Sequence, residues 1–426
     1  MKLTNNIYTD GKRFLKKYNI TNNNIKKINI EGSFAYYKKY KNYFIVARDH
    51  LGCKKIFWGT SKKGEITFSD NFIDLYSKIK NTESIRSCPA GVAVFINKNA
   101  KIIKKINIKR LNKENYSFIN LKNYSNKIKK KILFFLLGIK KLHGNKVYVC
   151  LSGGLDSTII AYLAKKIFKN VVAVSCSMLS DREYKMLLDK KNLNKNFKPS
   201  DDFKSARKIS KELGIKFEGI YFPESNCIKD LKKTMYACQD WRDYNVHCAI
   251  LNFQIAKKLI SHKNYNNEPV LTGDLMNEYL ADYKSEKING VEYYPQMKQL
   301  PSIKQRYFIR GLESSDRENG IFNFFKIPIF QPYSFVDMYY KHLPKKYLNK
   351  KKIKELLNGK IVNKRILNLI SKKKIRAQIG GKSGGILGFM IKKNIFQKIL
   401  EQKFCKSFKI SKKFIASFIE VGAYKN

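Results

Sequence analysis

The stretch that decides the fold is Lys146–Ser157, which reads KVYVCLSGGLDS. Its first part is a short, mostly apolar run of the kind that forms a buried strand, and Ser157–Phe168 then places apolar residues at helical spacing. Between them, Gly153 and Gly154 allow the backbone to turn tightly and to approach a ligand without side-chain obstruction. The first amides of the following helix lie at the positive end of its dipole. The stretch therefore predicts a strand, a phosphate-binding loop and a helix.

The polar residues of this loop indicate which anion it binds. Ser152 and Ser157 add hydroxyl donors, whereas Asp156 would repel a bare phosphate unless Mg²⁺ lay between them. We therefore expect a metal-bound pyrophosphate of a nucleotide. The alternative is an ordinary Gly-Gly turn in which serine and aspartate cap the next helix. A Walker A loop is excluded because its Lys-Ser/Thr ending is missing.

Outward from the loop, strands alternate with helices. Further strands are predicted at Val171–Ser175, Ile215–Phe222 and Pro269–Thr272, and helices at Asp202–Leu213 and His247–Ile260. This alternation is typical of an α/β fold with a parallel, Rossmann-like sheet covered on both faces. In such folds ligands bind at the carboxyl ends of the strands. After about residue 300 the pattern is mainly helical.

A second polar segment follows the fourth predicted strand, Thr272–Tyr283 (TGDLMNEYLADY). Acidic groups at the carboxyl end of a strand share the rim of the sheet with the phosphate loop. We therefore expect Asp274 and Glu278 to reach the metal or the substrate. The alternative for Asp274 is that it only caps a helix.

Together the two segments resemble the asparagine synthetase family, which includes β-lactam synthetases and lasso-peptide cyclases. The family's SGGxDS motif is matched at Ser152, Gly153, Gly154, Asp156 and Ser157, and its second segment is matched at Gly273, Asp274, Glu278 and Tyr283. The resemblance implies ATP and Mg²⁺ as cofactors. It also implies a ligase that forms C–N bonds, activating a carboxylate as an acyl-adenylate with release of pyrophosphate before an amine attacks.

The resemblance also implies roles for residues elsewhere. A late lysine of the family reaches the phosphates and is best matched by Lys374, with Lys373 and Arg376 as alternatives. Asn277 stands where the family has an aspartate ligand of Mg²⁺, and an amide is a weaker, uncharged ligand. Adenine recognition is implied near Val174, Ser175 and Cys176, and the substrate pocket near Trp241, Arg242 and Asp243.

Residues 1–110 read as β-rich, with strands expected at Asn42–Arg48, Lys55–Trp58 and Gly91–Asn97. Their GxFA-like segment at Gly32–Ala35 and RDxxG-like segment at Arg48–Gly52 resemble the family's glutaminase domain. That domain has a nucleophilic cysteine after the initiator methionine, where this chain has lysine. We therefore expect no glutamine hydrolysis, and an amine that is free ammonia, a substrate amine or an internal one.

These readings divide the chain into three parts. Residues 1–110 form a degenerate class II glutamine-amidotransferase-like domain. Residues 111–145 form a connector that is helical around Ile128–Lys141. Residues 146–426 form an ATP-pyrophosphatase (synthetase) domain with a helical C-terminal part.

Composition leaves one question open. The net charge of +53 indicates a polyanionic partner such as nucleic acid, but the lysines are spread over the whole chain, as AT-rich codon usage also produces. A tRNA-modifying relative (lysidine synthetase-like) therefore remains an alternative, and Asn277 leaves a non-catalytic nucleotide-binding relative as a second one. The eight cysteines form no CxxC pair, and apolar runs such as Ile132–Gly138 are too short to span a membrane. We expect a soluble cytoplasmic protein acting on a small-molecule or peptide carboxylate and an amine.

Overall fold

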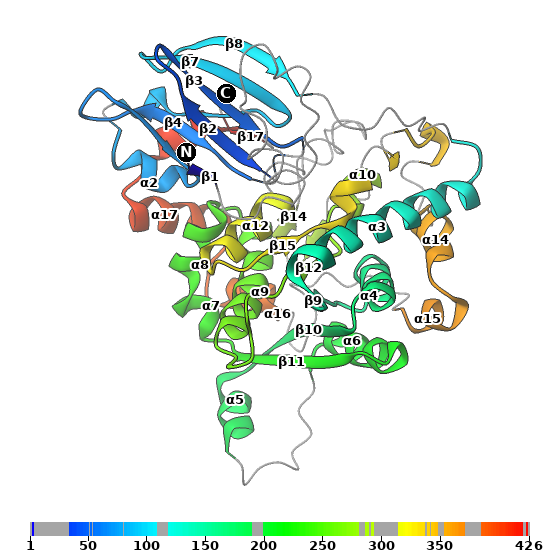
Figure 1. Ribbon diagram of the computed structural model, residues 1–426. Helices are drawn as coiled ribbons and strands as arrows, with labels where there is room; N and C mark the ends of the chain where they lie inside the picture. The colour runs from blue at the N-terminus through cyan, green and yellow to red at the C-terminus, as the bar shows by residue number, and fades with distance from the viewer. Residues whose placement is uncertain are drawn as a thin grey trace. The chain divides into compact units, whose positions relative to one another are not determined.

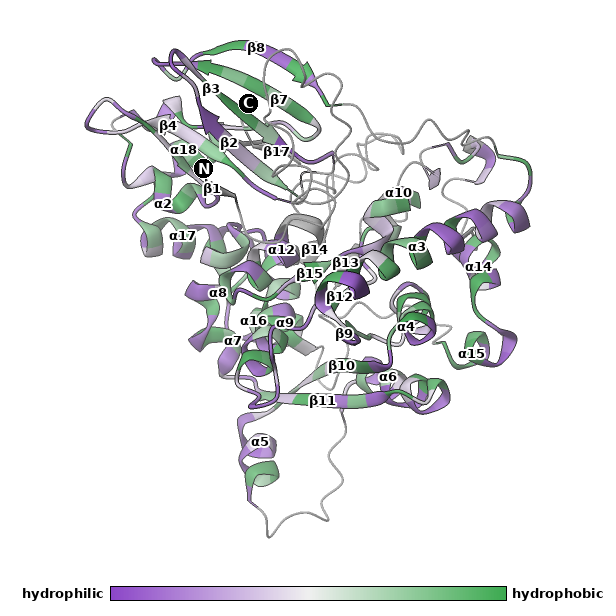
Figure 2. Cartoon of the chain, in the orientation of Figure 1, coloured by the Kyte–Doolittle hydropathy of each residue, from purple (hydrophilic) through white to green (hydrophobic). Residues whose placement is uncertain are grey.

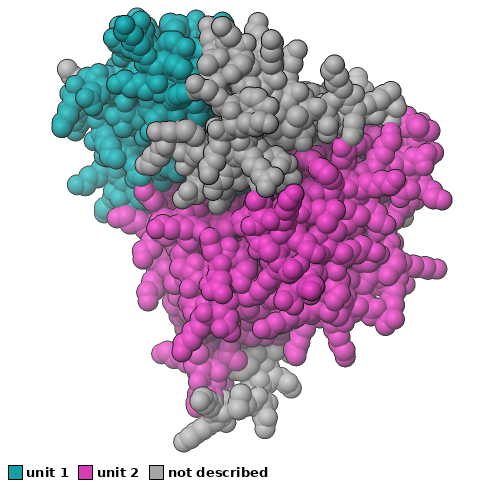
Figure 3. Space-filling view, in the orientation of Figure 1, with its two compact units in different colours: residues 1–115, 307–320, 402–426 teal, residues 116–306, 321–401 magenta. Residues whose placement is uncertain are grey.

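The computed structural model resolves two compact units (Figure 3). Unit 1 contains residues 1–115, 307–320 and 402–426, and unit 2 contains residues 116–306 and 321–401. The structure describes residues 2–3, 34–50, 52, 54–79, 81–108, 118–189, 199–280, 286–288, 291–293, 314–336, 339–340, 342–347, 353–370, 385–420 and 423–424.

Unit 2 is built on a five-stranded parallel sheet in the order β11-β10-β9-β12-β15 (Figure 1). The strands are β9 (Lys146–Cys150), β10 (Asn170–Leu179), β11 (Lys216–Pro223), β12 (Val270–Leu271) and β15 (Ile329–Phe330). The first four overlap the four runs predicted from the sequence. The predicted α/β fold with a parallel, Rossmann-like sheet is confirmed.

Two strands differ from the sequence prediction. β10 continues to Leu179, because Cys176–Leu179 pair with Ile220–Pro223 of β11. β15 was not predicted, since it has only two residues after Pro328 and local periodicity cannot distinguish so short a run from a loop.

Helices cover this sheet. α4 (Leu155–Ile167) contacts β9 and β10, α6 (Asp201–Leu213) contacts β10 and β11, and α9 (Asp243–Ile260) contacts the same two strands. α6 ends at Gly214 in the left-handed conformation, as its sequence predicted. The other helices of unit 2 include α3 (Leu121–His143), α5 (Asp181–Leu188), α7 (Asn226–Lys229), α8 (Leu231–Cys238), α10 (Met276–Leu280), α14 (Ile353–Asn358), α15 (Lys364–Leu369) and α16 (Gly385–Lys392).

The hydropathy of the chain follows these layers. Val147, Val149 and Val171 are buried in the sheet, and Ile160, Leu163 and Ala164 bury one side of α4. Figure 2 shows apolar residues in the strands and both hydrophilic and apolar stretches along α3. No helix in the described part of the chain has the length and the apolar character needed to cross a membrane.

Unit 1 contains the predicted β-rich region, and its strands pair in the antiparallel sense. One sheet has the order β1-β2-β3-β7-β8 and a second has the order β5-β4-β6. The strands are β1 (Lys2–Leu3), β2 (Ala35–Lys39), β3 (Tyr43–Arg48), β4 (Phe57–Thr60), β5 (Ile66–Ser69), β6 (Arg86–Ser87), β7 (Val92–Asn97) and β8 (Ile102–Asn107). Alternate residues of β3 enter two separate clusters, Ile45 in one and Val46 in the other, so both faces of the larger sheet are packed.

Candidate functional site

The predicted phosphate loop lies between β9 and α4, as the sequence indicated. Gly153 has φ +78°, and a Cβ at this position would lie 2.4 Å from the Ser205 Cβ and 3.1 Å from the Ala206 amide nitrogen of α6. Only glycine fits both the left-handed backbone and this close approach. The turn is therefore set by the helix packed against it as well as by its own sequence.

Two serines of the motif close the loop. The Ser157 hydroxyl accepts the Ser152 amide at 3.2 Å, lies 3.1 Å from the Ser152 hydroxyl, and donates to the Gly154 carbonyl oxygen at 3.3 Å. Ser157 is buried whereas Ser152 is exposed. The N-cap of α4 is Gly154, which has no side chain, and within the described residues no side-chain cap is present at this helix start. The amides of its first turn and the exposed Ser152 form an anion-binding arrangement.

Asp156 is fixed at two points in the first turn of α4. Its Oδ2 lies 2.6 Å from Nζ of Lys354, and its carbonyl oxygen accepts a hydrogen bond from the Tyr333 hydroxyl at 3.0 Å. Its Oδ1 is buried and has no hydrogen-bond partner within the described residues. Burial, followed by the negative charge of Asp156, raises the pKa of Tyr333 and of Tyr340 well above the ordinary value. Both phenols therefore stay neutral beside the carboxylate.

This donor set fits Mg²⁺. A buried carboxylate oxygen without a partner is a site where a cation would relieve the desolvation of a charge. No cluster of three or more His, Cys, Asp or Glu side chains suited to a metal occurs within the described ranges. Mg²⁺ in nucleotide sites usually takes one or two carboxylates and completes its shell with phosphate oxygens and water. Asp156 is the described residue that would hold it.

The second predicted segment meets the phosphate loop directly. A Cβ on Gly273, just after β12, would lie 2.5 Å from the amide nitrogen of Ser157, 2.6 Å from its Cα and 2.8 Å from the carbonyl carbon of Asp156. Asp274 follows in a turn and is half-buried. Gly273 and Ser157, which are 116 positions apart in the sequence (273 − 157), are thus brought into backbone contact, and glycine is required because the neighbouring atoms belong to the main chain of α4.

Sheet topology explains why these segments meet. From β9 the chain moves outward to β10 and β11, and it then returns to place β12 and β15 on the other side of β9. The strand order therefore reverses between β9 and β12, which pair in parallel through Tyr148↔Val270 and Val149↔Leu271. A doubly wound sheet binds its ligands in the crevice outside the carboxyl ends of the strands at such a reversal. The phosphate loop and Asp274 follow the two strands that flank it.

The other predicted site residues lie in several places. Val174 and Ser175 are buried in β10, and the Val174 carbonyl oxygen accepts the Leu151 amide at 2.9 Å. Asn277 and Glu278 lie in α10, and their side chains are outside the described part of the structure. Lys374, like Lys373 and Arg376, is outside the described residues altogether. Their roles stay predictions.

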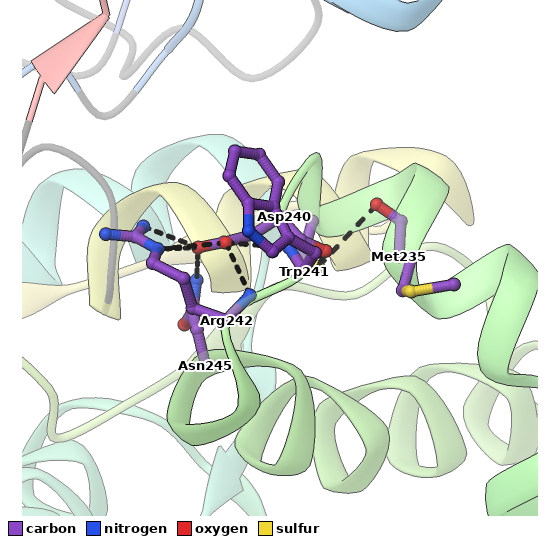
Figure 4. A network of polar contacts seen from close by, with 6 residues as sticks. Met235, Asp240, Trp241, Arg242 and Asn245 are labelled. Carbon is purple, nitrogen blue, oxygen red and sulfur yellow. Dashed lines mark hydrogen bonds and ion pairs between the residues drawn. The ribbon is translucent and has the colours of Figure 1, made fainter. Parts of the chain in front are cut away.

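Trp241 and Arg242 belong to a polar network at the start of α9 (Figure 4). The carboxylate of Asp240 accepts the amides of Trp241 and Arg242 at 2.7 and 2.9 Å, the Arg242 guanidinium at 2.5–3.1 Å, and the Asn245 amide at 2.6 Å. Burial opposes the charge of Asp240, but the Arg242 charge and these hydrogen bonds hold its pKa below the ordinary value. The network fixes the conformation of the chain at the start of α9.

Sequence reasoning missed two residues that contact Asp156 and the unusual carboxylate of Asp202 in α6. Tyr333 and Lys354 contact Asp156 from distant segments, and no local pattern distinguishes them from other tyrosines and lysines of the chain. Asp202 lies in the first turn of α6, after its cap Ser200. Burial, followed by the charge of Asp201, raises the pKa of Asp202 to about 7. The Ser-Asp-Asp start of this helix was the one local signal available.

In unit 1 the RDxxG-like segment builds a turn. The Arg48 guanidinium donates to the carbonyl oxygens of Lys54 at 2.6 Å, Gly52 at 2.5 Å and Cys88 at 3.2 Å. Burial raises the pKa of the Cys88 thiol to about 12, so this cysteine is protonated at neutral pH and is a poor nucleophile. Gly32 and Ser33 of the GxFA-like segment, and Cys53, lie outside the described residues.

Comparisons with known proteins find one family model that matches part of the chain. The asparagine synthase family model matches residues 143–319. No curated protein matches the sequence. One similar solved structure is NMN synthetase from Francisella tularensis, with 14% identity over 70% of this chain and 96% of that chain and a TM-score of 0.29. A second is NH3-dependent NAD synthetase from Campylobacter jejuni, with 19% identity over 38% of this chain and 61% of that chain and a TM-score of 0.24. A third is U34-tRNA thiolase from Methanococcus maripaludis, with 15% identity over 74% of this chain and 84% of that chain and a TM-score of 0.27.

Proposed function

We propose that this chain is an amide-forming synthetase, because residues 143–319 match the model of the asparagine synthase family, a family of ATP-using C–N ligases. It activates a carboxylate as an acyl-adenylate and then transfers the acyl group to an amine. The observation that carries the proposal is the contact of Gly273 with the main chain of Asp156 and Ser157. It brings an acidic segment to a phosphate loop at the reversal point of a parallel sheet, where nucleotides bind in such folds.

The loop binds the phosphates of ATP. The uncapped amides at the start of α4 and the Ser152 hydroxyl donate to phosphate oxygens, and Asp156 holds Mg²⁺ through the Oδ1 that lacks a protein partner. Mg²⁺, when bound, neutralises charge on the pyrophosphate and makes it a better leaving group. Asn277 is a further candidate ligand, and Val174 and Ser175 are candidates for the adenine side of the site.

The reaction has two balanced steps. A carboxylate oxygen attacks the α-phosphorus of ATP, and the bond to pyrophosphate breaks. The amine nitrogen then attacks the acyl carbon, the bond to AMP breaks, and the nitrogen loses a proton. Asp274 and Glu278 are the acidic groups that would contact the substrate or the cation on this rim. Lys374 is the candidate cation for the charge that develops on the carbonyl and the α-phosphate.

We also propose that the amine is not supplied by glutamine hydrolysis in this chain. A cysteine nucleophile must be present as the thiolate, and burial keeps Cys88 of β-rich unit 1 protonated. Free ammonia, a substrate amine or an internal amine would then attack the acyl-adenylate. The carboxylate is a small molecule or a peptide.

The test is pyrophosphate release from ATP and Mg²⁺ over a panel of acid and amine pairs. Asp156→Ala should abolish release, because it removes the metal-binding carboxylate. Glu355→Ala is the matched control, since it removes an exposed carboxylate from nearby α14 and should leave release unchanged. Retained turnover in Asp156→Ala would refute the assignment.

One observation favours a second candidate. The net charge of +53 suits a protein that binds tRNA and modifies it through a related phosphate loop. Binding to tRNA that weakens steeply with salt would support this candidate, whereas no binding at low salt would remove it. Tight ATP binding without pyrophosphate release for any acid would instead indicate a nucleotide-binding protein without catalysis.

A further inference from the structure

Lys354 lies in an unusual place for a lysine of this chain. Most lysines in the described part of the chain are exposed, but the side chain of Lys354 is 16% exposed and that of Asp156 is 20% exposed, and their charged atoms lie 2.6 Å apart. The two residues are 198 positions apart in the sequence. A partly buried ion pair that joins the phosphate loop to a distant helix restricts the carboxylate far more than an exposed pair would.

The helix that carries Lys354 is anchored on two sides. α14 packs against α3 and α4, and the Leu357 carbonyl oxygen of α14 accepts a hydrogen bond from the Ser125 hydroxyl of α3. On the other side, Asn358 contacts the Met276 sulfur of α10 at 3.7 Å and accepts the Tyr340 hydroxyl at 3.1 Å. Lys354 therefore extends from a fixed helix.

The same anchor reaches the second acidic segment. Tyr340 stacks on Tyr279 of α10, with ring centroids 5.5 Å apart and an interplanar angle of 14°. α10 also contains Asn277 and Glu278. The element that places Lys354 on Asp156 is thus packed against the helix that carries the other candidate metal and substrate residues.

The two oxygens of the Asp156 carboxylate have different surroundings. Lys354 takes Oδ2, whereas Oδ1 is buried without a hydrogen-bond partner within the described ranges. We propose that Lys354 is a positioning residue that holds the Asp156 carboxylate by Oδ2 and so presents Oδ1 to the cation of the bound nucleotide. This inference rests on the proposed ATP site and adds a residue to it.

The size of the expected effect follows from general behaviour of metal sites. Hydrogen bonds from outer residues orient a ligating carboxylate, and their loss weakens metal affinity by about 10- to 100-fold. If Lys354 positions Asp156, its removal should weaken cation binding although it also removes a nearby positive charge. If Lys354 instead competes with the cation for the carboxylate, its removal should strengthen cation binding. The two roles therefore predict opposite changes in cation affinity when Lys354 is removed.

The experiment measures Mn²⁺ binding by electron paramagnetic resonance, with a non-hydrolysable ATP analogue present, in the full chain. Lys354→Gln should weaken Mn²⁺ binding by about 10- to 100-fold, and Lys354→Arg should recover most of the loss because it keeps a cation on Oδ2. Lys360→Gln is the matched control, since Lys360 is an exposed lysine close to α14. Thermal melting of each variant checks folding.

A double-mutant cycle separates positioning from direct contact with phosphate. In an Asp156→Asn background, Lys354→Gln should change Mn²⁺ affinity little further, because the carboxylate that it positions is gone. Affinity for the analogue without metal should be unchanged by Lys354→Gln. A loss of metal-free nucleotide affinity would overturn the inference in favour of phosphate binding.

The remaining outcomes are also decisive. If the wild-type protein binds the Mn²⁺ nucleotide and Lys354→Gln binds it equally or more tightly, the positioning role is wrong and the ATP site stands. If the wild-type protein binds no Mn²⁺ nucleotide at all, the proposed function fails, and the role of Lys354 fails with it.

Discussion

The contact between Gly273 and the phosphate loop gives the sharpest prediction. In Gly273→Ala the new Cβ would meet the Ser157 amide nitrogen at 2.5 Å, the Ser157 Cα at 2.6 Å and the Asp156 carbonyl carbon at 2.8 Å, whereas ordinary contacts are 3.4–4 Å. The neighbouring atoms are main chain, so no side chain can rotate away. The start of α4 and the end of β12 must separate by about 1 Å, a displacement that is large for a binding site.

The expected effect of Gly273→Ala has two parts, a loss of stability and a loss of ATP affinity. Overpacking of this kind destabilises a protein by about 1–3 kcal/mol. Displacement of the loop also breaks at least one charge-assisted hydrogen bond to the nucleotide, worth about 1.5–3 kcal/mol, which corresponds to about 10- to 100-fold in ATP affinity. We expect both losses in the same variant, because one steric contact causes both.

The assay is calorimetric titration of ATP with Mg²⁺, together with urea unfolding. Gly359→Ala is the matched control in the same unit. Its Cβ would meet nothing closer than the Leu367 side chain at 3.5 Å, and its φ lies outside the left-handed region, so both quantities should stay near wild type. If Gly273→Ala bound ATP as tightly as Gly359→Ala and unfolded at the same urea concentration, the contact would not control the site and the reasoning would be refuted.

Two further predictions concern carboxylates of unit 2. Burial and then the charge of Asp201 raise the pKa of Asp202 from 3.8 to about 7 in the folded protein. The protonated form of Asp202 therefore contributes stability that is fully present below about pH 4 and is lost as the pH rises through 7. Asp202→Asn should therefore melt at a higher temperature than the wild type at pH 8 and at nearly the same temperature at pH 4. An equal difference in melting temperature at both pH values would contradict this. Asp240→Asn should lower the free energy of unfolding by about 3 kcal/mol, because it leaves the mostly buried Arg242 guanidinium without its anion. Urea unfolding measures this loss, and Asp240→Asn combined with Arg242→Met should recover part of it.

Much of the fold could be predicted from the sequence because its signals are local. The run Lys146–Ser157 combines an apolar strand, two glycines and the start of an amphipathic helix, and the structure confirms all three parts. The same holds for the end of α6 at Gly214, where a left-handed backbone favours glycine. Strands of the first unit were also predicted from β-branched and aromatic runs such as Asn42–Arg48, which contains β3, whereas their antiparallel pairing was not predicted.

The predicted second segment shows where sequence reasoning reaches its limit. The order Thr272-Gly273-Asp274 after a strand indicated the rim of a sheet, but the strand order was not predicted. Only the structure puts β12 beside β9, and only there does Gly273 touch the phosphate loop. The short β15 was missed for a related reason, since its two residues form a strand only through their pairing with β12.

The sequence by itself determined that a glycine turn joins a parallel strand to a helix, because backbone turns and helix starts depend on neighbouring residues. The tertiary structure alone decided what surrounds the Asp156 carboxylate. Lys354 lies 198 positions away, nothing in its local sequence distinguishes it from the chain's other lysines, and it meets Asp156 only because α14 packs on α3 and α4. Contacts between distant segments depend on how whole elements pack, and no local periodicity records that packing.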